Sequence, residues 1–339
     1  METCTTVSTK HNVLPPAGRP VPIMSGDMVT PSSLDVKFVL ERIARSWGTR
    51  ARVKHEELDL TFDADCADFL PSLLPFKNHP GYETVDDAVK SQILSCGWIA
   101  YNEKTVAIET VIVSPSCIHV LDEQIPGLAD ELSKQIVCET MVDEAYHLLL
   151  VKNANRITRT ARGLEKLRIP QFNLVKRMNA HQACYSDEWK KRIIQFATTI
   201  VSEIFVSDYL NLLADNRTIQ PLNRATVDAH RRDELTHSKI FRSLAKCFYT
   251  GLSSEQKSFF AEVLPKPVLW FADPELEIWL AILDQLGVRN ARTIIADCES
   301  MHGASLQRLD YSGIVELAKE IGILDSAIGR ESFERHGLL

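Results

Sequence analysis

The sequence predicts an all-α protein organised around a four-helix bundle with additional peripheral helices. Four segments carry apolar residues at helical spacing, and each is about 30 residues long, against a usual ~12. Two of these segments contain the same pattern, Asp-Glu-x-x-His, once at 143–147 and once at 233–237. No strand-rich stretch and no Gly-rich phosphate loop stands out. These observations favour one large helical domain.

The predicted elements follow one another along the chain. Residues 1–33 contain Ser, Thr, Pro and Gly without apolar period, which indicates a flexible arm. A first helix is expected at 34–47. The four bundle helices are expected at 85–113, 127–155, 186–215 and 221–251. Shorter, peripheral helices are expected at 253–264, 274–286, 290–301 and 312–322. We therefore divide the chain into an arm (1–33), a helical domain (34–325) and a C-terminal tail (326–339).

Local signals mark the ends of the bundle helices. Thr84 is the candidate N-cap of the first of them, and Pro115 lies just past its expected end. Ser186 is the candidate N-cap of the third. Pro221 and Gly251 open and close the fourth, as proline and glycine commonly do.

Composition is that of an ordinary soluble protein. Hydrophobic residues make up 45% and charged residues 24%, and a net charge of −7 gives no electrostatic reason to expect nucleic acid or an anionic membrane. The eight cysteines form no Cys-x-x-Cys pair, which indicates reduced thiols. The N-terminus lacks an apolar signal region, and no apolar run approaches the ~18 residues of a membrane span. We expect a cytoplasmic protein that binds neither nucleic acid nor membrane.

Each repeated pattern presents a carboxylate and an imidazole on one helix face. Glu144 and His147 are three residues apart, as are Glu234 and His237, and this spacing places both side chains of a pair together. A third Glu-x-x-His, at 299–302, lacks the preceding aspartate and is followed at once by a glycine. We interpret it as a chance match.

A single glutamate in an apolar setting precedes each pattern. Glu109 stands in "TVAIETVIV", and Glu203 stands in "TTIVSEIFV". The order Glu, then Glu-x-x-His, repeated once, is typical of ferritin-like di-iron and di-manganese carboxylate proteins. Four carboxylates neutralise two divalent ions. The alternative is four unrelated buried glutamates, each held in a salt bridge.

Six further residues are candidates for the same site. His230 shares a helical stripe with Glu234 and His237, so it is a candidate seventh ligand; the alternative is a surface histidine. Asp143 and Asp233 point about 100° away from the adjacent glutamates and are candidate acceptors for a ligand histidine on the opposite helix. A capping or salt-bridge role is the alternative for both. Three residues before Glu109 are candidates for lining a substrate pocket or for ordinary packing: Tyr101, Asn102 and Thr105.

Several stretches between about residue 70 and 320 resemble one family. They are "PFKNHP" (75–80), "WIAYNEKTVAIE" (98–109), "VDEAYH" (142–147), "TIQP" (218–221) and "HRRDELTHS" (230–238). The chain resembles the p-aminobenzoate N-oxygenase family of di-iron arylamine oxygenases, and most closely its branch in chloramphenicol biosynthesis. The histidine at 230 is part of this resemblance, because related bundles usually carry only the two Glu-x-x-His motifs.

The resemblance implies two iron ions as the cofactor and seven metal ligands, with no catalytic side chain beyond them. The implied ligands are Glu109, Glu144, His147, Glu203, His230, Glu234 and His237. It also implies a homodimer that uses O₂ to oxidise an aryl amine to a nitro group through hydroxylamine and nitroso stages. Because no dinucleotide fingerprint is present, electrons are expected from a separate reductase or ferredoxin.

Three alternatives to this function stay open at this point. Another di-metal carboxylate oxidase, such as an acyl desaturase or a di-manganese catalase, would use a similar ligand set. Iron storage would use a helical bundle without an organic substrate. A helical scaffold without metal is the third.

Overall fold

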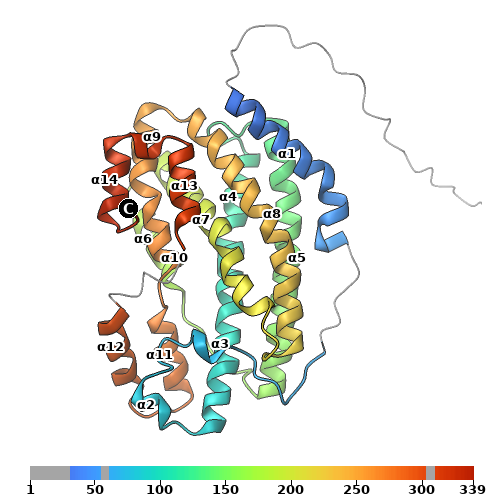
Figure 1. The fold of residues 1–339 in the computed structure, drawn as a ribbon, viewed down its shortest axis with the longest axis vertical. Coiled ribbons are helices and arrows are strands. Elements are labelled where there is room, and N and C mark those ends of the chain that lie inside the picture. Colours follow the sequence, from blue (N-terminus) through green and yellow to red (C-terminus); the bar gives the residue numbers. More distant parts are fainter. Residues whose placement is uncertain (1–30, 55–60, 303–309) are drawn as a thin grey trace, which may run out of the picture.

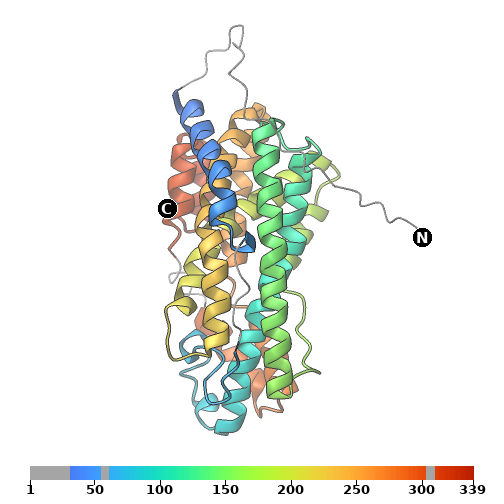
Figure 2. The ribbon, with the colours of Figure 1, turned by 90° about the vertical axis from the view of Figure 1, so that its right-hand side faces the viewer.

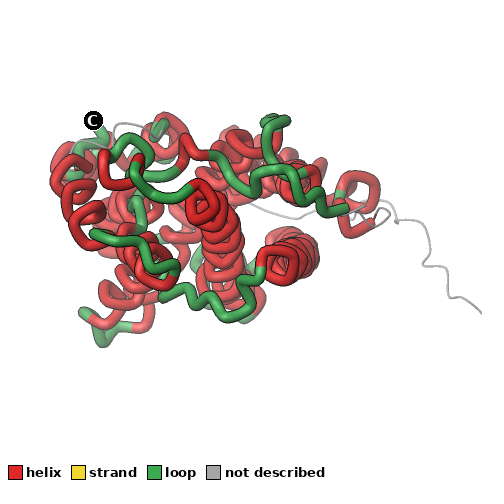
Figure 3. Tube along the Cα trace, turned by 90° about the horizontal axis from the view of Figure 1, so that it is seen from below, coloured by secondary structure: helices red, strands yellow, loops and turns green. Residues whose placement is uncertain are grey.

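The computed structural model describes residues 31–54, 61–302 and 310–339. Most of the predicted arm, residues 1–30, lies outside the described residues. Helices account for nearly all regular structure in the described ranges, and the only strand-like pairing there is an isolated bridge between Ala67 and Ile219. Seen from below, the trace consists of helices joined by loops (Figure 3). The predicted all-α class is confirmed.

Four long helical rods form the centre of the molecule (Figure 1). They are α3 with its continuations η3 and α4 (Asp87–Ala107, Ile108–Val113 and Ser114–Leu121), α5 (Glu131–Arg162), α7 (Glu188–Ala214) and α8 (Pro221–Gly251). α7 packs along α8, and α3 packs along α5. All four rods correspond to predicted bundle helices.

Shorter elements surround this bundle. They are α1 (Pro31–Arg50), η1 (Arg52–Lys54), η2 (Pro71–Leu73), α2 (Pro80–Glu83), α6 (Asn173–Ala183), α9 (Ser254–Val263), α10 (Pro265–Phe271), α11 (Leu276–Gln285), α12 (Ala291–His302), α13 (Ser312–Glu320), η5 (Ile323–Asp325) and α14 (Ala327–Arg335). α1 lies on the outside of the bundle against α5 and α8 (Figure 2). The peripheral helices were predicted as a group, although α2, α6, α10 and α14 were not individually expected.

The C-terminal residues are not a tail. Residues 327–335 form α14, which packs on α9, and Phe333 is fully buried there. Ser326 caps this helix by accepting a hydrogen bond from the N–H of Gly329. This short, mostly polar helix was not expected from the sequence.

Several helix ends differ from the sequence signals by a few residues. Asp86, not Thr84, caps α3, because its carboxylate accepts a hydrogen bond from the first turn of the helix. Asp187, not Ser186, stands at the N-cap of α7, and its side chain makes no capping bond. α5 continues past the predicted residue 155 and stops at Gly163, whose φ of 67° glycine adopts without strain.

The first bundle helix does not end before Pro115 as predicted. Pro115 stands in the first turn of α4 and cannot donate a backbone hydrogen bond, and the preceding turn widens into the π-helix η3. Side chains of α7 compensate the affected carbonyls. Gln195 Nε2 donates to the carbonyls of Val111 (2.9 Å) and Ile112 (2.8 Å). Thr199 Oγ1 also donates to Ile112, at 3.1 Å. The rod therefore stays continuous through the proline.

The segment Asp87–Leu121 also bears on the expectation about membranes. By length and composition alone it could cross a membrane, and 44% of its most apolar 18-residue window is buried inside the structure. It is the only such helix in the described part of the chain. Here it serves as a rod of the bundle.

We predict that Gln195→Leu lowers the free energy of unfolding by about 1–3 kcal/mol, because the Val111 carbonyl loses its buried donor. Urea unfolding followed by circular dichroism measures this loss. Gln135→Leu, at an exposed glutamine on α5, is the matched control and should change stability by less than about 0.5 kcal/mol. Equal effects of the two variants would contradict the role assigned to Gln195.

Candidate metal centre

Each rod of the bundle contributes one glutamate to a single buried cluster. Glu109 comes from η3, Glu144 from α5, Glu203 from α7 and Glu234 from α8, and none of the four is more than 1% exposed. Their helices bring together residues that are far apart in the sequence. All four predicted carboxylates are therefore present at one place.

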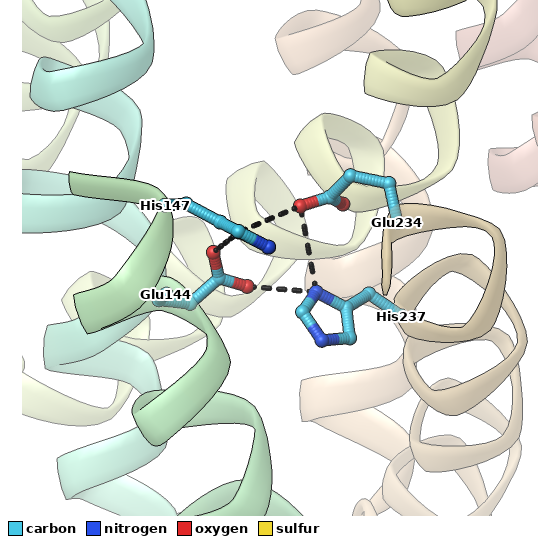
Figure 4. Close-up of side chains that lie close together, drawn as sticks. All are labelled: Glu144, His147, Glu234 and His237. Carbon is cyan, nitrogen blue, oxygen red and sulfur yellow. Dashed lines mark hydrogen bonds and ion pairs between the residues drawn. The ribbon is translucent and has the colours of Figure 1, made fainter. Parts of the chain in front are cut away.

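Glu144 and Glu234 lie between His147 and His237 (Figure 4). The Nδ1 atom of His147 is 2.8 Å from Glu144 and 3.4 Å from Glu234. The Nδ1 atom of His237 is 2.8 Å from Glu144 and 3.5 Å from Glu234. Each of these two carboxylates thus faces both imidazoles.

The remaining candidates lie on opposite sides of this pair. His230 Nε2 is 2.9 Å from Glu234 Oε1, and its ring centroid is 4.1 Å from that of His147. Glu203 Oε2 is 3.8 Å from His237 Nδ1. His230 is only 1% exposed, so the alternative of a surface histidine is excluded.

The donor atoms suit metal ions. One set of ligand atoms within 4.8 Å of one another comes from Glu144, His147, Glu234 and His237, and a second comes from Glu109, Glu144, His230 and Glu234. One oxygen of each of the four glutamates is buried and makes no hydrogen bond to the described residues. Such atoms cost free energy unless a cation compensates them. The residues therefore fit a pair of divalent ions.

The electrostatics of the cluster lead to the same conclusion. Burial raises the pKa values of Glu109 and Glu203 well above the ordinary range, and the neighbouring carboxylates raise them further. Burial also acts to raise the pKa of Glu144, but His237 and His147 outweigh it and the net shift is strongly downward. Burial acts to lower the pKa of His147, but Glu144 and other acceptors raise it to about 10. Without metal, protons would thus supply the positive charge that the cluster requires.

Two aspartates hold the outer nitrogens of two histidines. His147 Nε2 is 3.2 Å from Asp233, and His237 Nε2 is 3.3 Å from Asp143. Each aspartate is on the helix opposite to its histidine. Because each aspartate lies against Nε2, Nδ1 is the ring nitrogen that faces the glutamates and would be available to a metal ion.

The three candidate pocket residues do not line one pocket beside the cluster. Asn102 is buried and donates to Asn155 of α5 at 3.0 Å, and Thr105 donates to its own helix at the carbonyl of Tyr101. Tyr101 lines a cavity of about 220 Å³ between α3 and α11. Eight residues correspond to about 80° around a helix, so Tyr101 does not share the face of Glu109.

Sequence reasoning missed a larger hollow beside η3. It has a volume of about 550 Å³, and its walls include Ala107, Thr110, Arg159 and Phe172. These walls come from distant segments of the chain, so no local pattern indicates the hollow. Glu299 of the third Glu-x-x-His is exposed on α12 and is not in the metal-ligand sets of the described residues, while the side chain of His302 lies outside the described part of the structure.

Comparison with known proteins agrees with this site. The model of the p-aminobenzoate N-oxygenase AurF family matches residues 34–322. The chain is also 30% identical over 302 residues to a 4-aminobenzoate N-oxygenase of Streptomyces thioluteus, an alignment that covers 87% of this chain and 89% of that protein. The family match spans every residue of the cluster. The chain therefore belongs to the p-aminobenzoate N-oxygenase family of oxygenases.

Proposed function

We propose that this protein binds two iron ions and uses O₂ to convert an aryl amine to an aryl nitro compound through hydroxylamine and nitroso stages. The observation that carries the proposal is the buried cluster of four glutamates and three histidines in a chain of this family. Four carboxylates balance the charge of two divalent ions. The same donor types bind iron in ferritin-like carboxylate proteins.

The distances suggest how the ligands are shared. Glu144 and Glu234, each of which faces two imidazoles, would hold the ions at the centre of the cluster. His237 and Glu203, whose nearest atoms are 3.8 Å apart, would hold metal on one side. Glu109, His147 and His230 would complete the ligand set. When bound, the iron pair supplies electrons for the activation of O₂.

The protein itself orients these ligands and excludes water. Asp143 and Asp233 keep two imidazoles turned toward the glutamates. Ile112 and Val113, beside Glu109, are fully buried and belong to the apolar core that closes the bundle around the cluster. A site that excludes water limits side reactions of reactive intermediates with the solvent.

The substrate and partners follow from the same assignment. We propose that the aryl amine is the amine precursor of chloramphenicol, on the basis of the family branch that the sequence resembles. Electrons come from a separate reductase or ferredoxin.

A homodimer is supported by three exposed apolar residues on α5 and α8: Val142, Leu149 and Leu235. We also propose a cytoplasmic location, on the basis of eight cysteines with no Cys-x-x-Cys pair in the sequence.

We predict about two iron atoms per purified chain, as four carboxylates and three histidines imply. Glu144→Ala and Glu234→Ala should each abolish or severely reduce iron binding, measured by elemental analysis. Glu299→Ala removes an exposed glutamate of the third Glu-x-x-His and should leave the iron content unchanged. Retention of two iron atoms and full activity by both cluster variants would show that the metal assignment is wrong.

His230→Ala should leave a folded protein, because both Glu-x-x-His pairs survive. We expect the rate of nitro product formation to fall at least tenfold, which corresponds to ~1.4 kcal/mol in the activation barrier. Product is measured by chromatography after reduction and exposure to O₂. His336→Ala, which lies outside the cluster on the C-terminal segment, is the control. Wild-type turnover of His230→Ala would remove this residue from the ligand set.

Reduced protein with O₂ should convert an aryl amine to its nitro compound, and ¹⁸O₂ should place label in the nitro group. A panel of p-aminobenzoate, the amine precursor of chloramphenicol and a fatty acyl substrate, analysed by mass spectrometry, tests the substrate class. Desaturated or hydroxylated acyl product, with both amines unchanged, would replace the arylamine assignment by an acyl oxidase. Iron uptake without any product would favour storage.

A further inference from the structure

One segment outside the bundle contacts Asp143 and Asp233, the aspartates that lie against His237 and His147. We call this segment, α1 and η1 (Pro31–Lys54), the strap. Trp47 Nε1 donates to the two carboxylate oxygens of Asp143 at 3.0 and 3.2 Å. Arg50 Nη1 is 3.7 Å from the same carboxylate. The strap therefore supplies Asp143 with a hydrogen-bond donor and a nearby positive charge.

The same strap also contacts the second aspartate. The backbone N–H of Arg52 donates to Asp233 Oδ1 at 3.2 Å. Asp143 and Asp233 are fully or almost fully buried, so strap donors replace the water that would otherwise solvate them. Each aspartate thus has a ligand histidine on one side and the strap on the other.

We propose that Trp47 is a positioning residue of the metal centre, acting through Asp143 on His237. A carboxylate that is held by two contacts from the indole N–H cannot turn freely, and so it keeps the Nε2–H of His237 pointing outward. Nδ1 of that imidazole then stays directed at the glutamates. The proposal rests on the proposed function only in requiring that the cluster binds divalent metal.

The two sides of the centre depend on the strap differently. The His237 side depends on a side chain, Trp47, which a substitution can change. The His147 side depends on a backbone amide, which substitution of Arg52 leaves in place. Loss of the indole donor should therefore weaken the metal next to His237 and leave the metal next to His147 in place.

The test is the rate at which the reduced, iron-loaded protein loses iron to a chelator. Trp47→Phe keeps an aromatic ring and removes the donor, and we expect iron to be released up to about tenfold faster, the lower end of the effect of losing a direct partner of a ligand histidine. Trp189→Phe, at a partly buried tryptophan near the start of α7, is the control and should release iron like the wild type. Equal release from all three proteins would overturn the proposal.

Thermal unfolding separates positioning from packing. Trp47→Phe should lower the Tm of the iron-loaded protein more than it lowers the Tm of the metal-free protein, because the lost donor to buried Asp143 affects both forms and the lost metal-binding free energy affects only the first. An equal fall in both values would assign Trp47 to packing and contradict the proposal. Neither measurement uses an amine, so both hold for a protein that binds iron but makes no nitro product.

A double-mutant cycle identifies the route. If Trp47 acts through Asp143, then Trp47→Phe should add nothing to the iron loss of Asp143→Asn. The same change should add its full effect to Asp233→Asn, which disturbs the other histidine. Additivity with Asp143→Asn, or an absence of additivity with Asp233→Asn, would show that the strap does not act along this path.

Discussion

Burying a carboxylate among apolar side chains costs several kcal/mol unless a cation or hydrogen-bond donors compensate it, and this protein buries four in one cluster. That requirement explains the rest of the site. Two imidazoles lie within 2.8 Å of Glu144, and two aspartates hold those imidazoles from behind. The metal ions that the ligand set fits would complete the compensation. Without them the arrangement keeps four carboxylate oxygens unsatisfied.

The π-helix η3 belongs to the same arrangement. It carries Glu109 into the cluster in a rod that would otherwise be interrupted at Pro115. The wider turn and the proline leave backbone carbonyls in need of donors, and the carbonyl of Ile112 is buried. Gln195 and Thr199 of the neighbouring rod satisfy them. The position of Glu109 in the cluster is thus supported by hydrogen bonds from α7, the helix that also provides Glu203.

The sequence predicted the ligand cluster better than its surroundings, and the reason is physical. Spacing of three or four residues along a helix translates directly into position on one face, so the pairs at Glu144 and Glu234 could be recognised. The contact of Trp47 with Asp143 joins residues 96 positions apart, and no local pattern encodes it. Tyr101 lines a cavity between α3 and α11, and because its walls come from distant segments, no local pattern indicates where that cavity lies. The helix end predicted before Pro115 was wrong, because side chains of α7 donate the hydrogen bonds that the proline cannot.

The strap has a consequence for the order of folding. Its contacts with Asp143 and Asp233 join residues separated by 96 and 181 positions, so the earliest described part of the chain must wait for α5 and α8 before it can dock. Contacts of such long range close large loops and form slowly. During synthesis the bundle helices can pair as they emerge, whereas the outer support of the two histidines is completed only after α8 has been made. A newly made chain therefore passes through a stage in which its ligands are assembled but not yet locked.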